Sequence, residues 1–222
     1  SGGFTAPFCA PDLVWDFRLP RVKSISASGH KFGLAPLGVG WVLFRDAAEL
    51  PDELVFHVTY LGGDMPTFQI NFSRPAGQII AQYAGFLRLG RDGYAAAHGS
   101  AYRTAQHLAD QLPEVGPFEL IYDGDPATGI PAVTWQLAAD AKVTWTLYEL
   151  ADRLRTRGWQ VPAYPLTGDL DSQVVQRALI RVEITTDEIN SLIADMRDAV
   201  EFLERHPVSV QMTQDEGTSF SH

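Results

Sequence analysis

The second half of the chain contains the pattern that most constrains its fold. Short apolar strands alternate there with two amphipathic helices, and each helix opens with a threonine followed three residues later by a glutamate. These pairs, Thr146 with Glu149 and Thr185 with Glu188, are capping boxes, which satisfy free amide groups in the first turn of a helix. Strands that alternate with helices predict a compact α/β layer. The strands are predicted at 119–122, 132–137 and 178–184.

The first half predicts a short sheet edge. After a proline-rich opening over residues 1–20, residues 22–27 alternate apolar and polar side chains, as a strand does. Residues 38–44 form a second strand, rich in β-branched and aromatic side chains. The turn between them contains Ser28 and ends in a histidine followed by Lys31. We therefore expect the sheet edge to present Lys31 at its rim.

A long helix follows these strands. Ser73 is its predicted N-cap, with a proline in the first turn, and we expect a break near residues 90–93, where two glycines occur. Residues 57–69 show no clear period and predict a mobile loop. The character of the chain changes inside the helical region, which predicts domains at 1–101 and 102–222, with a flexible tail from about residue 208.

Composition excludes several classes of function. The net charge of -10 and the pI near 4.9 argue against binding to nucleic acid or to an anionic membrane, because both need a basic face. The single cysteine, Cys9, cannot form a disulfide within the chain. No apolar run is long enough to cross a bilayer, and the histidines lack the spacing of metal ligands. We expect a cytoplasmic protein with no metal and no stable membrane insertion.

Lys31 is the first candidate for chemistry. The small residues before it allow a ligand to approach the backbone closely, and Ser28 with the neighbouring amides suits a phosphate. A desolvated lysine loses its proton more easily and becomes a nucleophile toward an aldehyde. The same features fit an ordinary surface lysine on a polar turn, so the residues alone leave both interpretations open.

A resemblance adds weight to the first interpretation. Residues 22–38 resemble the cofactor-lysine segment of the glutamate decarboxylases, which belong to the pyridoxal phosphate (PLP)-dependent group II decarboxylases. The resemblance covers nearly the whole chain and weakens only over the last dozen residues. It implies an α/β fold of PLP fold type I, with the C-terminal part of the large domain followed by the small C-terminal domain. Further matching segments lie at 1–4, 10–20, 60–63, 71–75 and 157–162.

The resemblance also implies roles for residues around the cofactor. Lys31 would form a Schiff base with PLP, and His30 and Ser28 would help to hold its phosphate. Ser73 would reach the phosphate in the site of a neighbouring subunit, which implies a homodimer or a larger homo-oligomer. These assignments describe a cofactor site shared between subunits.

Three further residues are implied at the substrate entrance and in regulation. Arg177 would pair with a substrate carboxylate, although a surface ion pair also fits it. Tyr60 would lie on a loop that covers the site, although ordinary loop packing also fits. His222 ends a tail that resembles the bacterial tail that plugs the site near neutral pH, where a histidine titrates. The tail is acidic and lacks tryptophan, so we expect no binding to calmodulin.

The implied activity is the decarboxylation of L-glutamate to 4-aminobutanoate (GABA) and carbon dioxide. PLP would accept the electrons that the departing carboxylate leaves behind, and each turnover would consume a proton, which suits bacterial acid resistance. In the family, the acidic residue against the pyridine nitrogen lies just before the segment that matches residues 1–4. We therefore expect the chain to be a fragment that lacks the N-terminal half, binds PLP poorly and is inactive alone.

Two alternatives remain open at this point. The parent protein is another PLP-dependent decarboxylase of the same fold, such as one that acts on aromatic amino acids. Alternatively, the chain is a non-catalytic fragment that associates with a complete subunit. A substrate screen on the full-length protein distinguishes the first alternative from a glutamate decarboxylase. Copurification of the chain with a longer chain would support the second.

Overall fold

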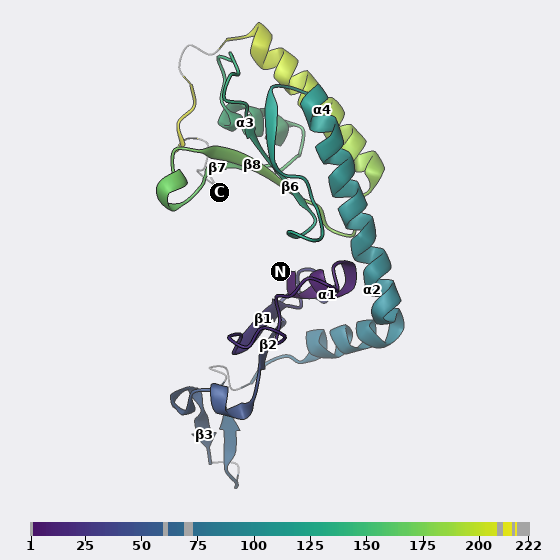
Figure 1. Cartoon of the computed structure of the whole chain (residues 1–222), viewed down its shortest axis with the longest axis vertical. Helices are drawn as coiled ribbons and strands as arrows, with labels where there is room; N and C mark the ends of the chain where they lie inside the picture. The colour runs from purple at the N-terminus through teal and green to yellow at the C-terminus, as the bar shows by residue number, and fades with distance from the viewer. Residues whose placement is uncertain (1, 60–61, 69–72, 208–210, 215, 217–222) are drawn as a thin grey trace. The chain divides into compact units, whose positions relative to one another are not determined.

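The computed structural model describes residues 2–59, 62–68, 73–207, 211–214 and 216 (Figure 1). The chain divides into two compact units, Ser1–Ala95 and Ala96–His222. The helix α2, Gly77–Gln111, contributes residues to both units. The expected functional division after residue 101 stays a prediction. The described residues include no helix with the length and hydropathy needed to span a membrane.

The first unit is built on a pair of antiparallel strands, β1 and β2. Ser24 lies opposite Phe44 and Ser28 opposite Gly40, so the chain reverses through the predicted turn. The expected sheet edge is therefore confirmed. The bounds are η1 Gly2–Phe4, α1 Ala6–Cys9, β1 Ser24–Ser28, β2 Gly40–Phe44, η2 Ala47–Glu49 and η3 Asp52–Leu54.

The loop expected over residues 57–69 was wrong at residues 57–58 and 65–67, which lie in strands, and residues 60, 61 and 69 lie outside the described residues. Strands β3, Phe56–Val58, and β4, Met65–Thr67, form an antiparallel hairpin. The His57 imidazole Nδ1 lies 2.8 Å from a carboxylate oxygen of Asp64, which joins the two strand ends. Strands of three residues are too short to show a period of two in the sequence.

Helix α2 begins later than predicted and bends where predicted. It begins at Gly77, so the N-cap assignment for Ser73 was wrong. The physical reason is Pro75, which disfavours the helical conformation of Arg74 before it. The break is confirmed at Gly90, whose φ of 57° and ψ of -167° lie outside the helical region and favour glycine.

The second unit is a two-layer α/β structure. Its sheet is antiparallel in the order β5-β6-β8-β7, and the helices α3 and α4 pack against one another (Figure 1). Both capping boxes are confirmed at the starts of these helices. The bounds are η4 Leu112–Glu114, β5 Phe118–Tyr122, β6 Ala132–Leu137, α3 Leu147–Thr156, β7 Ala163–Pro165, η5 Gly168–Leu170, β8 Val174–Leu179 and α4 Thr186–Arg205.

The last strand differs from its predicted position. The sequence predicts it at 178–184, whereas β8 ends at Leu179. Ile184 donates its amide to the carbonyl of Arg181, so the apolar residues after the strand form a turn that leads into α4. In the sequence, apolar and polar residues continue to alternate after Leu179, where pairing with β6 stops. No feature of the sequence marks the end of the strand.

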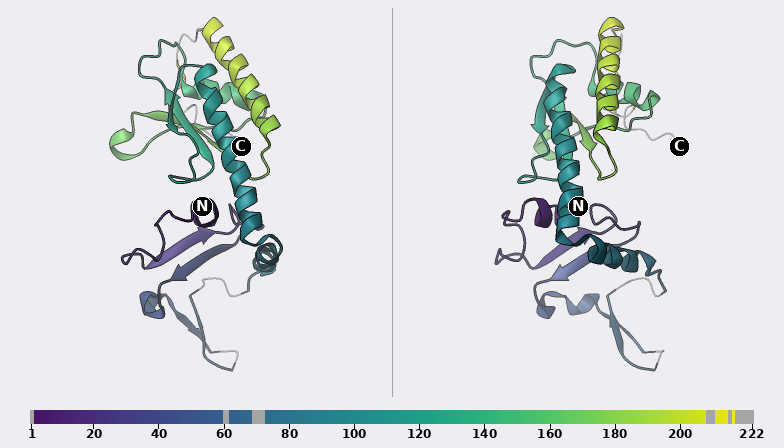
Figure 2. Two further views of the ribbon diagram at one scale, coloured as in Figure 1. Left: turned by 45° about the vertical axis from the view of Figure 1, so that its right-hand side comes forward. Right: turned by 90° about the vertical axis from the view of Figure 1, so that its right-hand side faces the viewer.

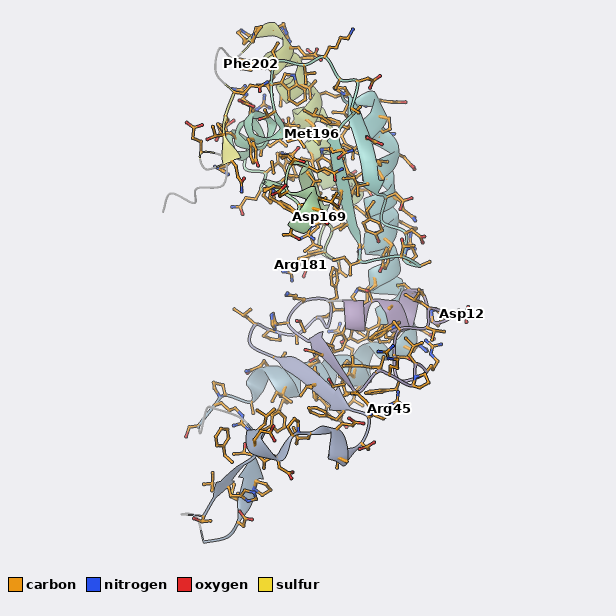
Figure 3. All side chains as sticks on the ribbon, turned by 60° about the vertical axis from the view of Figure 1, so that its left-hand side comes forward. Asp12, Arg45, Asp169, Arg181, Met196 and Phe202 are labelled. Atoms are coloured by element: carbon orange, nitrogen blue, oxygen red, sulfur yellow. The ribbon has the colours of Figure 1, made fainter. Side chains whose placement is uncertain are left out.

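The core of the second unit lies between the sheet and its helices. Val133 and Trp135 of β6 are fully buried, and Ala178 pairs with Val133 and belongs to the same core. Met196 of α4 also lies in this core, as Figure 3 shows, and the views in Figure 2 show the helices on one side of the sheet. Arg177, the neighbour of Ala178, is exposed because alternate strand residues face opposite sides.

Candidate functional site

The candidate site is the turn between β1 and β2, which carries Lys31. The turn is closed by its own backbone: Lys31 donates its amide to Ser28 O at 3.3 Å, and Ala35 donates to Gly29 O at 3.2 Å. Lys31 is exposed, while the next residue, Phe32, is buried and anchors the turn. A fixed turn therefore presents a primary amine to solvent.

Two buried glycines flank Lys31 at equal distances along the chain. A methyl group on Gly29 would lie 2.3 Å from Oε1 of Gln82, and one on Gly33 would lie 2.3 Å from Nε2 of the same side chain. Either separation is far shorter than a van der Waals contact. Both ends of the lysine turn are glycine because the Gln82 amide occupies the space that their side chains would need.

His30 has a defined ring orientation beside the lysine. Its Nδ1 lies 2.7 Å from the carbonyl oxygen of Val39, which also accepts the His30 backbone amide at 3.1 Å. A carbonyl oxygen only accepts, so Nδ1 carries a proton and donates it. In the neutral ring, Nε2 is then the free acceptor, and in the charged ring it is a second donor.

The other residues singled out from the sequence lie elsewhere. Ser73 is exposed and precedes α2 in the first unit. Arg177 is exposed on β8 in the second unit, with its guanidinium 5.8 Å from the ring centre of Tyr164. Tyr60 and His222 lie outside the described residues. The structure thus brings together Ser28, His30 and Lys31, as they are close in sequence.

Sequence reasoning missed two buried polar residues that contact this turn. Gln82 and Tyr94, both on α2, donate hydrogen bonds to the carbonyl of Gly33. One signal was present in the sequence. Gln82 lies four residues before Phe86, on the apolar stripe of the helix, where a polar residue must find a partner when buried.

The residues of the turn fit PLP. Lys31 offers an accessible amine for the aldehyde, and His30 and Ser28 offer an imidazole and a hydroxyl within three residues of it. An imidazole and a hydroxyl are suitable donors for a phosphate. Together, the amine, the imidazole and the hydroxyl are suited to bind a molecule that carries both an aldehyde and a phosphate group.

Comparison with sequence families identifies the same chemistry. The family model of the pyridoxal-dependent decarboxylase conserved domain matches residues 1–138. A glutamate decarboxylase of Aliivibrio fischeri is 52% identical over 222 residues, which is 100% of this chain and 47% of that protein. Glutamate decarboxylase beta of Listeria monocytogenes is 47% identical, again over 100% of this chain and 47% of its own length. The chain therefore spans about half the length of the curated relatives it matches.

Solved structures agree with these relatives. The glutamate decarboxylase of Lactobacillus brevis has a TM-score of 0.85 and 46% sequence identity, covering 94% of this chain and 46% of its own. A sphingosine-1-phosphate lyase of Burkholderia pseudomallei has a TM-score of 0.70 and 26% sequence identity. The match covers 92% of this chain and 44% of the lyase chain. An Escherichia coli cysteine desulfurase, at 16% identity and a TM-score of 0.58 over 90% of this chain and 51% of its own, shares the fold alone.

These comparisons confirm the fold class and the resemblance expected from the sequence. The relatives match the chain from end to end, and the structural neighbours are PLP-dependent enzymes of fold type I. The matched domain covers the candidate turn and more than half of the residues. The chain belongs to the pyridoxal-dependent decarboxylase family.

Proposed function

We propose that the complete protein decarboxylates L-glutamate to 4-aminobutanoate and carbon dioxide with PLP as its cofactor. The observation that carries the proposal is the 52% identity, over the whole chain, to a protein named glutamate decarboxylase. The exposed Lys31 on a fixed turn supports it independently, because a PLP enzyme needs an accessible amine at a defined position.

Lys31 holds the cofactor in this proposal through its side-chain amine. When bound, PLP supplies an electron sink for the pair of electrons that the departing carboxylate leaves behind. His30, whose Nδ1 donates to the carbonyl of Val39, and Ser28 would help to hold the phosphate of the cofactor. The carbon that loses carbon dioxide takes up one proton, which gives the reaction its link to acid resistance.

Three residues complete the site in this proposal. Arg177 pairs with a carboxylate of the substrate, for which its exposure and its guanidinium are suited. Ser73 contributes to the phosphate site of a second subunit, so the active form is a homodimer or larger. Tyr60 lies on a segment that covers the site. The proposal assigns residues 1–101 to the C-terminal part of the PLP-binding large domain and residues 102–222 to the small C-terminal domain.

The proposal also includes regulation and location. His222 closes the site near neutral pH, and protonation of the histidine releases the tail as the pH falls. A cytoplasmic enzyme with this property consumes protons only when the cell interior becomes acidic. Deletion of residues 219–222 should extend activity toward neutral pH, and an unchanged pH profile refutes this part of the proposal.

The direct test measures the products of the complete protein with a panel of amino acids. We expect equal amounts of 4-aminobutanoate and carbon dioxide from glutamate, and no comparable turnover of aromatic amino acids. Lys31→Ala should lose the visible absorbance of the bound cofactor and the activity together. Preference for an aromatic substrate would refute the proposed specificity, and full activity of Lys31→Ala would refute the assignment of the lysine.

A further inference from the structure

Two buried side chains from outside the lysine turn hold the same atom of it, the carbonyl oxygen of Gly33. Gln82 donates to it from Nε2 at 3.0 Å, and Tyr94 donates from its hydroxyl at 2.9 Å. These donors are 49 and 61 residues away along the chain, and each side chain is only 1% exposed. A carbonyl oxygen has two lone pairs, so this arrangement satisfies both.

The bend in α2 makes this arrangement possible. Gln82 lies on the helical segment before Gly90, and Tyr94 lies on the segment after it. A straight helix turns by about 100° and rises about 1.5 Å per residue, so side chains twelve residues apart would point about 120° away from each other around the axis and lie roughly 18 Å apart along it. The change of direction at Gly90 lets both side chains reach one oxygen atom.

The orientation of the Gln82 amide is fixed by a third residue. Nε1 of Trp41, on β2, donates to Oε1 of Gln82 at 2.6 Å, which leaves the amide nitrogen to face Gly33. Because the glutamine also lies against Gly29 and Gly33 on either side of Lys31, it contacts both ends of the turn. At both glycines, an atom of the Gln82 amide is the nearest neighbour of the position that a methyl group would occupy.

Tyr94 is equally constrained. Its ring stacks on Phe8 with centroids 4.9 Å apart and lies 5.6 Å from the ring of Phe86. Burial raises the pKa of the Tyr94 hydroxyl above its ordinary value, so the group remains a donor at physiological pH. A buried donor held on two sides by aromatic rings loses little further freedom when it binds the turn.

We propose that Gln82 and Tyr94 are positioning residues for Lys31, which fix the direction of its side chain by holding the carbonyl of Gly33. The inference rests on the proposed role of Lys31 as the cofactor lysine. Covalent chemistry at a lysine requires its amine at a defined place, and misplacement of a reacting group by about 1 Å can cost about 100-fold in rate. The two donors hold the turn two residues after Lys31.

The chain offers matched variants for the test. Gln82→Met removes the amide and keeps the length of the side chain, and Gln78→Met is its control, one turn earlier on the same helix. Gln78 makes only a long hydrogen bond of 3.5 Å, to Gly38 O. Tyr94→Phe removes a single hydroxyl, and Tyr83→Phe is its control, because Tyr83 is 61% exposed. Tyr94→Phe keeps the ring packing, so it remains informative if Gln82→Met folds poorly.

Three readouts on the complete protein separate positioning from general stability. The first is hydrogen exchange of the amides of Lys31 and Ala35 in the cofactor-free protein, which should rise about tenfold in both test variants through local opening. The second is the rate at which PLP attaches to Lys31, followed by visible absorbance. The third is kcat per bound cofactor, which should fall by about tenfold while KM for glutamate stays within about twofold.

The outcomes decide between the two roles. If the test variants lower the melting temperature but leave local exchange, attachment rate and kcat per bound cofactor equal to those of the controls, the two residues are merely structural and the inference is overturned. If the wild-type protein attaches PLP at Lys31 but does not act on glutamate, the proposed function fails. Exchange and attachment then still test the positioning role, because neither depends on the substrate.

Discussion

Replacement of Gly33 by alanine tests the packing around the lysine turn most severely. The new methyl carbon would lie 2.5 Å from the carbonyl oxygen of Gly29 and 2.7 Å from its Cα, as well as 2.3 Å from Gln82 Nε2. The first two atoms belong to the backbone of the same turn and cannot move aside by a change of rotamer. The turn itself must therefore open.

The cost of this change follows from two contributions. Overpacking of a tight site costs typically about 1–3 kcal/mol. Opening of the turn also weakens the hydrogen bonds that Gly33 O accepts from Gln82 and Tyr94, each worth about 0.5–1.5 kcal/mol. We expect Gly33→Ala to lower the free energy of unfolding by about 2–4 kcal/mol, the lower half of the combined range of about 2–6 kcal/mol, because the hydrogen bonds are weakened and not removed.

Gly77→Ala is the matched control. Gly77 opens α2, and an added methyl group there would meet nothing within 4 Å. Alanine has the higher helix propensity, so this variant should be neutral or more stable by up to about 1 kcal/mol. Urea titrations of both variants of the complete protein measure the difference. Equal stability of Gly33→Ala and Gly77→Ala would refute the account of the turn.

The remaining predictions concern the second unit. Leu154→Ala should lower the free energy of unfolding by about 2–5 kcal/mol, because Leu154 is 0% exposed. Leu170→Ala should have little effect, because Leu170 is 54% exposed, and similar urea midpoints for the two variants would contradict this prediction. Hydrogen bonds from Thr185 lower the pKa of Glu188 below 4.5, so the carboxylate stabilises the fold above that pH. The difference in melting temperature between wild type and Glu188→Ala should therefore shrink as the pH falls below about 4.5, and a constant difference would count against it. Tyr122→Phe should lower the free energy of unfolding by about 0.5–1.5 kcal/mol in a urea titration, because its single hydroxyl proton is shared between two backbone carbonyls, and no loss would argue that this hydrogen bond contributes nothing.

Local patterns in the sequence predicted much of the fold. The capping boxes at Thr146 and Thr185 fix helix starts through contacts three residues apart, so the sequence contains all the information needed. The start of α2 depended on a competition between two local signals, and Pro75 outweighed the capping tendency of Ser73. The hairpin β3–β4 was missed because its strands are too short for a periodic signal.

The candidate site was only partly predictable for a different reason. Ser28, His30 and Lys31 lie within one turn, so their proximity follows from the sequence. The contact of Gln82 with Gly29 and Gly33 depends on tertiary packing over about fifty positions, and no local pattern encodes it. The small residues before Lys31 were interpreted from the sequence as giving room to a ligand, whereas the structure shows that Gly29, one of them, gives room to a glutamine.

The central claim is that Lys31 carries the cofactor, and reductive trapping tests it most directly. The complete protein is incubated with PLP, reduced with borohydride, digested and analysed by peptide mass spectrometry. This chain contains two other lysines: Lys23, which forms an ion pair with Glu49, and Lys142, which is exposed. The account predicts a stoichiometric adduct on Lys31 and none on the other two. An adduct distributed over all three, or absent from Lys31, would contradict it.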